Sequence, residues 1–163
     1  MCGRFVRLSP TPVIVKRFNV EKTFLPEISP SYNISPDKDV LIVNQEQQRQ
    51  LLHCRWGFIP SWVRDISKGG RMINARSETV ADKPAFRNSF RKHRCLIVAD
   101  GFFEWGSYLG RKNPFYIRLK SKEPFGFAGI TSLWESPDGG ILFTCAIITT
   151  KPNDLIKSVH HRM

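Results

Sequence analysis

The sequence predicts an α+β fold in which most strands are antiparallel, and three observations lead to this class. The chain has 163 residues, a length that suits one domain with its own hydrophobic core. Its β-branched and aromatic residues gather in short runs of strand length. Proline and glycine separate these runs as turns do, and no repeat, low-complexity tract or linker divides the chain. We therefore treat residues 1–163 as a single domain.

Apolar runs at five places are predicted to be strands. In chain order they are VLIV (40–43), CLIVA (95–99), PFYIRL (114–119), FAGITSLW (127–134) and ILFTCAIITT (141–150). The segment SPDGG (136–140) predicts a hairpin between the last two, because its glycines can adopt the positive φ that such turns require. The segment GSYLGRKNP (106–114) predicts a longer hairpin loop.

Helices are expected to be fewer than strands. We expect them near residues 11–18, over 82–93, and from the segment KPNDLIKSV (151–159) onward. In the second, Asp82 is the predicted N-cap, and Phe86 and Phe90 share one face because they are four residues apart. In the third, Pro152 suits the first turn.

The chain is strongly basic. Lys and Arg total 25 against 14 acidic residues, which gives a formal net charge of +11. Such an excess favours a polyanionic partner, either nucleic acid or an acidic membrane surface. Basic charge that only keeps the protein soluble is the alternative, and composition does not choose between them.

Neither a secreted nor a metal-dependent protein is indicated. Arg, Lys or Pro interrupts every apolar run near the N-terminus, so no signal peptide is recognisable. No window approaches the ~20 apolar residues that a membrane span needs. The four cysteines lie far apart without a CxxC pair, which argues against a zinc module and a disulfide framework. We expect a cytoplasmic protein with no metal, no other cofactor and no membrane partner.

Cys2 differs from the other cysteines in its surroundings. Cys95 and Cys145 lie within apolar runs, where cysteine usually behaves as a small buried hydrophobe. Cys2 instead follows Met1 in the opening segment MCGRF. Removal of Met1 would leave an α-amine and a thiol on one residue, a 1,2-aminothiol that no internal cysteine can offer.

Glu104 stands among aromatic residues in ADGFFEW (99–105), directly after a predicted strand. Strand alternation puts Phe103 and Trp105 on one face and Phe102 and Glu104 on the other. A carboxyl group that shares its face with Phe102 would be partly desolvated, which raises its pKa towards general acid–base catalysis. The alternative is a solvated glutamate on an edge strand.

The segment INARSET (73–79) also has two interpretations. It is either a helix start, with Asn74 or Ser77 as the cap, or a polar site. In the polar site, the Asn74 amide would both donate and accept hydrogen bonds, and Arg76 would bind phosphate.

Tryptophan and histidine residues mark two further places. The tryptophans of WGFIPSW (56–62) are typical of a core, but Trp62 in a Gly- and Pro-containing loop of a basic protein is also a candidate for stacking on a nucleic-acid base. His160 and His161 are either a solvated pair or the source of a catalytic imidazole.

Six motifs together resemble one known family. In order, MCGRF, SYNISP, WGFIPSW, INARSET, RCLIVADGFFEW and VHHRM resemble the SOS response-associated peptidase (SRAP) family, and they span essentially the whole chain. Its members are abasic-site processing proteins that crosslink to damaged DNA. The resemblance implies a barrel-like pair of β-sheets with flanking helices and a positively charged channel for single-stranded DNA.

The resemblance also implies roles for particular residues. Cys2 would be the nucleophile, Glu104 would shuttle protons, His160 would protonate the sugar oxygen, and Asn74 would orient the opened sugar. The expected DNA-binding residues are Arg4, Pro36, Trp62 and Arg76. In two respects the chain departs from the family pattern: His161 stands where the family usually has Asp, and the family domain continues beyond Met163, so we expect a further C-terminal portion.

The chemistry of an N-terminal cysteine agrees with this function. An abasic site opens to an aldehyde at the sugar C1′. An α-amine with an unperturbed pKa of ~8 is partly neutral near physiological pH and can add to that aldehyde. After loss of water, the thiol adds to the same carbon, and the nitrogen, Cα, Cβ, sulfur and C1′ close a thiazolidine ring.

We therefore expect a monomeric sensor of abasic sites in single-stranded DNA that associates with the nucleoid on DNA damage. Lyase activity and autoproteolytic removal of Met1 are expected as further activities. Two alternatives stay open. One is a cysteine peptidase that uses Cys2, Glu104 and His160 mainly to remove Met1. The other is a basic single-strand binder in which Cys2 is incidental.

Overall fold

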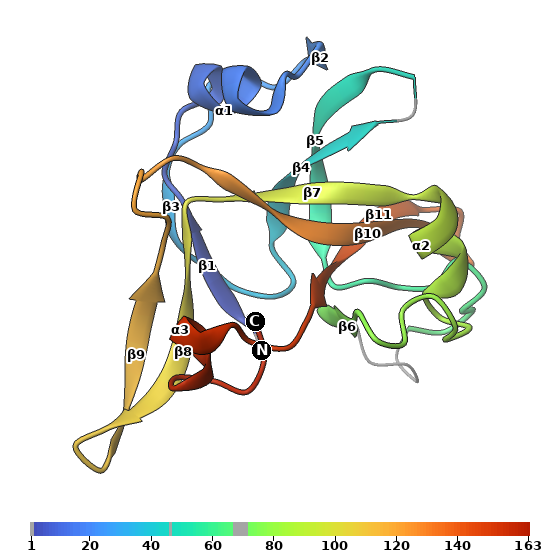
Figure 1. The fold of residues 1–163 in the computed structure, drawn as a ribbon. Coiled ribbons are helices and arrows are strands. Elements are labelled where there is room, and N and C mark those ends of the chain that lie inside the picture. Colours follow the sequence, from blue (N-terminus) through green and yellow to red (C-terminus); the bar gives the residue numbers. More distant parts are fainter. Residues whose placement is uncertain (1, 46, 67–71) are drawn as a thin grey trace.

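The computed structural model describes residues 2–45, 47–66 and 72–163, which form two β-sheets with short helices around them (Figure 1). The smaller sheet has the order β3-β1-β8-β9 and is antiparallel throughout. Its strands are β1 (Arg4–Arg7), β3 (Ser31–Ile34), β8 (Gly101–Tyr108) and β9 (Arg111–Ile117).

The larger sheet closes into a barrel. Its order is β2-β5-β4-β7-β10-β11-β6, and a parallel pairing of β5 with β11 joins β5, β4, β7, β10 and β11 into a ring. Antiparallel pairing dominates the ring, which confirms the predicted α+β class and the barrel-like architecture. The strands are β2 (Lys22–Thr23), β4 (Asp39–Gln45), β5 (Arg49–Trp56), β6 (Asn74–Arg76), β7 (Arg94–Ala99), β10 (Phe125–Glu135) and β11 (Ile141–Thr149).

The predicted strands are confirmed as parts of β4, β7, β9, β10 and β11. The hairpin at 136–140 is also confirmed, with Gly139 at φ 86° and Ser136 N–H donating to Gly140 O at 2.8 Å. The long loop expected at 106–114 is wrong, because β8 and β9 continue to a tight turn. Leu109 and Gly110 form that turn with φ values of 51° and 73°, and positive φ at both positions matches the twist of a two-residue hairpin.

The helices are short, and they are α1 (Thr11–Phe18), α2 (Arg87–Lys92) and α3 (Asp154–Lys157). Helix α1 agrees with the prediction. Helix α2 begins later than expected, and Asp82 is not its N-cap, because Asp82 lies in the preceding turns, where its backbone N–H donates to the Thr79 carbonyl oxygen at 3.2 Å. Helix α3 is capped by the side chain of Asn153, so Pro152 lies before the helix and not in its first turn. No helix in the described ranges is long and apolar enough to cross a membrane.

The barrel core determines where the N-terminus lies. Phe5 of β1 is fully buried, with its ring centroid 5.2 Å from that of Trp56 and 5.7 Å from that of Phe127. This packing anchors β1 against the barrel and holds the residues before it in the interior. The cysteines at positions 54, 95 and 145 are buried in the same cluster, as predicted for those in apolar runs.

Candidate active site

Strand pairing brings Cys2 and Asn74 together. Cys2 directly precedes β1 and is only 2% exposed, because the neighbouring Phe5 is anchored in the core. Strand β6 runs parallel to β11 with Asn74 opposite Ile147, which places the Asn74 side chain against the N-terminal segment. Asn74 Nδ2 donates a hydrogen bond to the Cys2 carbonyl oxygen at 3.1 Å. The alternative that Asn74 begins a helix is wrong.

Glu104 is buried in the middle of the smaller sheet. Strand β8 lies between β1 and β9, so Glu104 is not on an edge strand, and its exposed fraction is 2%. The flanking Trp105 is 39% exposed, as the predicted alternation requires. The interpretation of Glu104 as a solvated edge residue is therefore wrong. The desolvated carboxyl group faces the same interior as Cys2.

His160 approaches Glu104 from the segment that follows α3. Its Nε2 lies 3.9 Å from Glu104 Oε2. Its Nδ1 faces the backbone of Arg162, with the N–H at 3.0 Å and the carbonyl oxygen at 3.1 Å. The ring is thus held from its Nδ1 side in either tautomer, and Nε2 is the nitrogen directed at Glu104. The His161 ring stacks on that of His160 at 4.3 Å and is exposed.

The thiol of Cys2 is in an unfavourable place for a thiolate. Burial raises its pKa to about 12, and the negative charge of Glu104 adds to the effect. The sulfur is therefore protonated near neutral pH. Because the thiolate is the reactive form of cysteine, this sulfur is not activated in the way that a cysteine peptidase requires.

The four predicted DNA-binding residues come from separate segments of the chain. Arg76 is exposed and lies two residues after Asn74 in β6, on the same face of that strand. Arg4 pairs with Phe103 and so lies on the face of the smaller sheet opposite to Glu104, where its Nη1 donates to Asn33 Oδ1 at 3.1 Å.

The other two predicted DNA-binding residues lie in loops. Pro36 is half-buried in the turn between β3 and β4. Trp62 is 65% exposed and lines a separate pocket with Phe58, Pro84 and Arg87.

Comparison with known proteins identifies the family. The family model described as SOS response associated peptidase (SRAP) matches residues 1–163. The chain belongs to the SRAP family. In the described ranges, this SRAP protein has no group of three or more His, Cys, Asp or Glu side chains that could hold a metal ion.

Relatives and a solved structure are similar over most of the chain. The abasic site processing protein YoqW of Bacillus subtilis (strain 168) is 46% identical over 167 residues, which cover 100% of this chain and 74% of YoqW. The abasic site processing protein HMCES of Gallus gallus is 32% identical over 166 residues, which cover 82% of this chain and 49% of HMCES. A crystal structure of a Bacteroides thetaiotaomicron protein superimposes with a TM-score of 0.88 at 28% identity, over 99% of this chain and 75% of that one.

Sequence reasoning missed the ion pair that supports the histidine of this SRAP site. Arg162 donates from Nη1 and Nη2 to the two carboxylate oxygens of Glu78 at 2.7 and 2.9 Å, and Nη2 also donates to the Thr149 carbonyl. These hydrogen bonds hold the pKa of Glu78 at about 2, below its usual 4.5. The two partners are 84 residues apart in the sequence, so no local pattern predicts that they meet. The one available signal was that two of the motifs carry residues of opposite charge.

Proposed function

We propose that this SRAP protein forms a covalent thiazolidine with abasic sites in single-stranded DNA through Cys2, after Met1 has been removed. The observation that carries the proposal is the cluster formed by buried Cys2 and Glu104 with the half-buried Asn74 and His160. The names of the relatives, which are abasic site processing proteins, support the substrate. Met1 lies outside the described residues, so its removal is part of the proposal.

The order of steps follows from the two nucleophiles of Cys2. An α-amine with an ordinary pKa of ~8 is partly unprotonated near neutral pH, whereas the thiol pKa is about 12. The amine therefore adds first to the C1′ aldehyde, and loss of one water gives an imine. The thiol then adds across the C=N bond, so that sulfur bonds to carbon and its proton passes to nitrogen.

The supporting residues have distinct roles in this sequence. Glu104 is buried beside Cys2, where it can accept and return the protons of addition and dehydration. His160 Nε2 would protonate the ring oxygen of the abasic sugar as that sugar ring opens. Asn74 positions the nucleophile through the Cys2 carbonyl, and its buried Oδ1, without a hydrogen-bond partner in the described ranges, would accept from a hydroxyl of the opened sugar.

The DNA strand would be held by electrostatic and stacking contacts outside the cluster. Arg4 and Arg76 would contact phosphates, while Pro36 and Trp62 would pack against bases. We extend the proposal to a monomer that acts on single strands near the nucleoid, with autoproteolytic removal of Met1 and lyase activity through the imine.

The proposal can be tested with an oligonucleotide that bears one abasic site. The products are analysed by mass spectrometry and on denaturing gels. Protein with a free Cys2 amine should form a heat-stable adduct equal to the summed masses less one water. Protein with an acetylated amine should form none, because an amide nitrogen does not add to aldehydes. Protein that retains Met1 should form no heat-stable adduct either, because the free amine of methionine gives only an imine and methionine has no thiol to close the ring. Cys2→Ala should give only an imine that borohydride traps, since no sulfur can close the ring. Cys54→Ala, which removes a different buried thiol, is the matched control and should keep the adduct.

The same experiment distinguishes the alternatives. Ring closure loses no atoms, so the imine and the thiazolidine have equal mass, and heat stability separates them. A heat-stable adduct from the acetylated protein or from protein that retains Met1 would show that sulfur acts alone, and the proposed mechanism would be wrong.

A further inference from the structure

The strand that carries Glu104 also carries a glycine on the same face. Alternation puts Glu104 and Gly106 on one side of β8, where both are buried, whereas Trp105 between them is exposed. The segment that bears His160 packs on this glycine, through Val159, the residue directly before the histidine. Position 106 is therefore where the His160 segment meets the strand of Glu104.

The contact between this segment and β8 leaves no room for a side chain at position 106. A Cβ on Gly106 would lie 3.0 Å from Phe115 Cε2, 3.1 Å from Val159 Cγ1 and 3.2 Å from Val159 Cα. Carbon atoms at their optimal separation are about 3.5–4.0 Å apart, so all three contacts would be too short. The Phe115 ring and the Val159 side chain can tilt. The Val159 Cα belongs to the backbone and gives way only if the segment moves.

Backbone conformation gives no reason for a glycine at this position. The glycines with positive φ in the described ranges are those at positions 57, 110 and 139, and Gly106 is not among them. A glycine inside a strand is otherwise destabilising relative to alanine, because it has more freedom to lose on folding and no side chain to pack. The close approach of the His160 segment is therefore the property that glycine provides at position 106.

His160 is supported from both sides along the chain. On one side, Thr150 and Met163 exchange two backbone hydrogen bonds, at 2.7 and 3.0 Å, which close the segment between them into a loop. Within this loop the backbone N–H of Arg162 donates to His160 Nδ1 at 3.0 Å. On the other side, the support is the contact of Val159 with β8. A change in that contact would therefore shift the imidazole ring relative to a fixed base.

We propose that Gly106 is a positioning residue of the crosslinking reaction. Because it has no side chain, Val159 packs directly on β8, and this contact sets the 3.9 Å between His160 Nε2 and Glu104 Oε2. The inference rests on the proposed function, in which both groups move protons on the same sugar. Gly106 has no group that takes part in the chemistry, so it acts only through His160. A shift of the ring affects proton transfer and leaves the reversible binding of DNA intact.

Gly106→Ala tests the inference in otherwise intact protein with a free Cys2 amine. Single-turnover crosslinking to an abasic oligonucleotide should slow about tenfold, which is less than the 10²-fold that a misplacement of about 1 Å can cost. Binding of an intact single strand, measured by fluorescence anisotropy, should be unchanged. A double-mutant cycle with His160→Ala separates positioning from a general structural effect. If Gly106 acts through His160, adding Gly106→Ala to His160→Ala should slow crosslinking no further.

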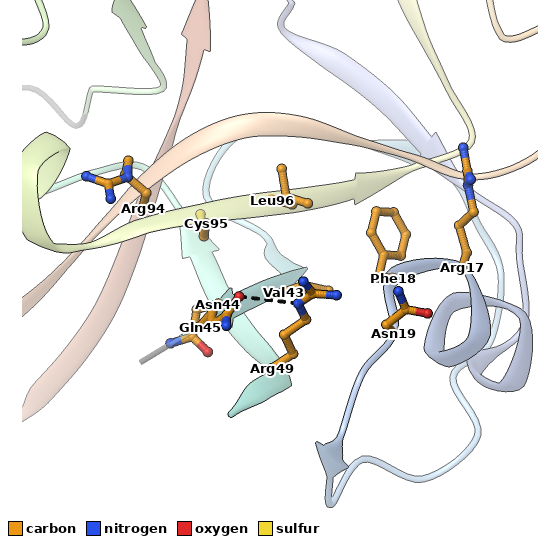
Figure 2. Close-up of a pocket in the computed structure, with 10 residues that line it drawn as sticks. All are labelled: Arg17, Phe18, Asn19, Val43, Asn44, Gln45, Arg49, Arg94, Cys95 and Leu96. Carbon is orange, nitrogen blue, oxygen red and sulfur yellow. Dashed lines mark hydrogen bonds between the residues drawn. The ribbon is translucent and has the colours of Figure 1, made fainter. Parts of the chain in front are cut away.

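Gly126→Ala, in β10, is the matched control for crowding at a strand glycine. A Cβ on Gly126 would lie 2.9 Å from Leu96 Cβ. Figure 2 shows Leu96 in a groove of about 430 Å³ between α1, the β4–β5 hairpin and the start of β7. In Figure 1, α1 and the free ends of β4 and β5 project at one end of the molecule, and the chain termini lie away from that end. Gly126→Ala should therefore keep the crosslinking rate of the folded protein, whatever it does to stability.

Two-dimensional NMR of the histidine rings reads the placement of His160 without any reaction. In Gly106→Ala the His160 signals should move, while those of His53 in β5 stay in place. In Gly126→Ala the His160 signals should not move.

Three results would each overturn the inference: unmoved His160 signals in Gly106→Ala, an unchanged crosslinking rate, or equal slowing in the presence and absence of the His160 side chain. Failure of the proposed function gives a different result. Wild-type protein would then form no adduct, while the His160 signals would still move in Gly106→Ala, and the placement of His160 by Gly106 would stand.

Discussion

Glu104→Gln separates proton transfer from sulfur reactivity. Glutamine keeps the shape of the side chain, which is 2% exposed, but it carries no charge and cannot exchange a proton as a carboxylate does. Loss of a general acid–base typically costs ~10²–10⁴ in rate, or about 2.7–5.4 kcal/mol at 1.36 kcal/mol per decade. Crosslinking to abasic DNA should slow by this factor, with water as the remaining proton carrier.

The thiol should change in the opposite direction. The negative charge of Glu104 is the second cause of the raised pKa of Cys2, after burial, so its removal should lower that pKa from about 12. At a fixed alkaline pH, Cys2 in Glu104→Gln should therefore react faster with iodoacetamide than in the wild-type protein. Faster alkylation together with slower crosslinking is expected only where the amine reacts first and Glu104 moves protons.

Single-turnover kinetics on an abasic oligonucleotide measure the crosslinking rate. Alkylation with iodoacetamide as a function of pH, followed by mass spectrometry, measures the reactivity of the thiol. Glu135→Gln, at an exposed position of β10, is the matched control and should change neither. Thermal unfolding checks that Glu104→Gln is folded. An unchanged crosslinking rate in folded Glu104→Gln would remove Glu104 from the mechanism, and crosslinking that rises with alkylation would assign the first attack to sulfur.

The remaining predictions concern the support of the cluster and the surface around it. Asn74→Ala removes the 3.1 Å hydrogen bond to the Cys2 carbonyl, worth about 0.5–1.5 kcal/mol, so single-turnover crosslinking should slow about 2- to 13-fold, and no slowing would mean that Asn74 does not position the nucleophile. The pKa of Glu78 is lowered from 4.5 to about 2 in the folded protein, so its pair with Arg162 stabilises the fold fully above pH 4.5 and progressively less as the pH falls towards 2. Urea unfolding across this range should show that loss in the wild-type protein and a smaller one in Glu78→Gln; equal pH profiles would contradict the pairing. Arg76→Ala should lower the salt slope of single-strand binding by ~0.7, measured by anisotropy, and an unchanged slope would remove Arg76 from the phosphate contacts.

The parts of the fold that were predictable from sequence are those with local signals. The apolar runs of β4, β7, β10 and β11 are rich in β-branched residues, so they were visible as strands. Strand β5 contains Arg49, His53 and Arg55 among its apolar residues and was missed. The ring closes through the parallel pairing of β5 with β11, near Trp56 and Cys145, and neither segment carries a local mark of that contact. The barrel was therefore expected from the family resemblance and not from periodicity.

The candidate site shows the same division between chemistry and placement. The family resemblance implied that Cys2, Asn74, Glu104 and His160 form the site, whereas residue type alone left an alternative open for each of the last three. Their contacts depend on tertiary structure. Asn74 hydrogen-bonds to Cys2, 72 residues away in the sequence, and His160 comes from the segment that follows α3. Alternation in β8 left the burial of Glu104 open, since one face of a strand can be solvated or covered, and only tertiary packing decides which.

The burial of Cys2 is better suited to an aminothiol than to a thiol nucleophile. A peptidase needs a thiolate before its substrate arrives, and a buried cysteine whose pKa is raised to about 12 by burial and by the charge of Glu104 does not provide one. An aminothiol has the opposite requirement, because its amine must react first and its sulfur needs only to be close when the imine forms. Intramolecular addition then compensates for the weak nucleophilicity of a protonated thiol, since sulfur and imine carbon are held within one residue's reach. A thiol that stays protonated is also less readily oxidised while the protein waits for a damaged strand. The same burial that argues against peptidase chemistry therefore supports a sulfur that is used only after the DNA has been bound covalently through nitrogen.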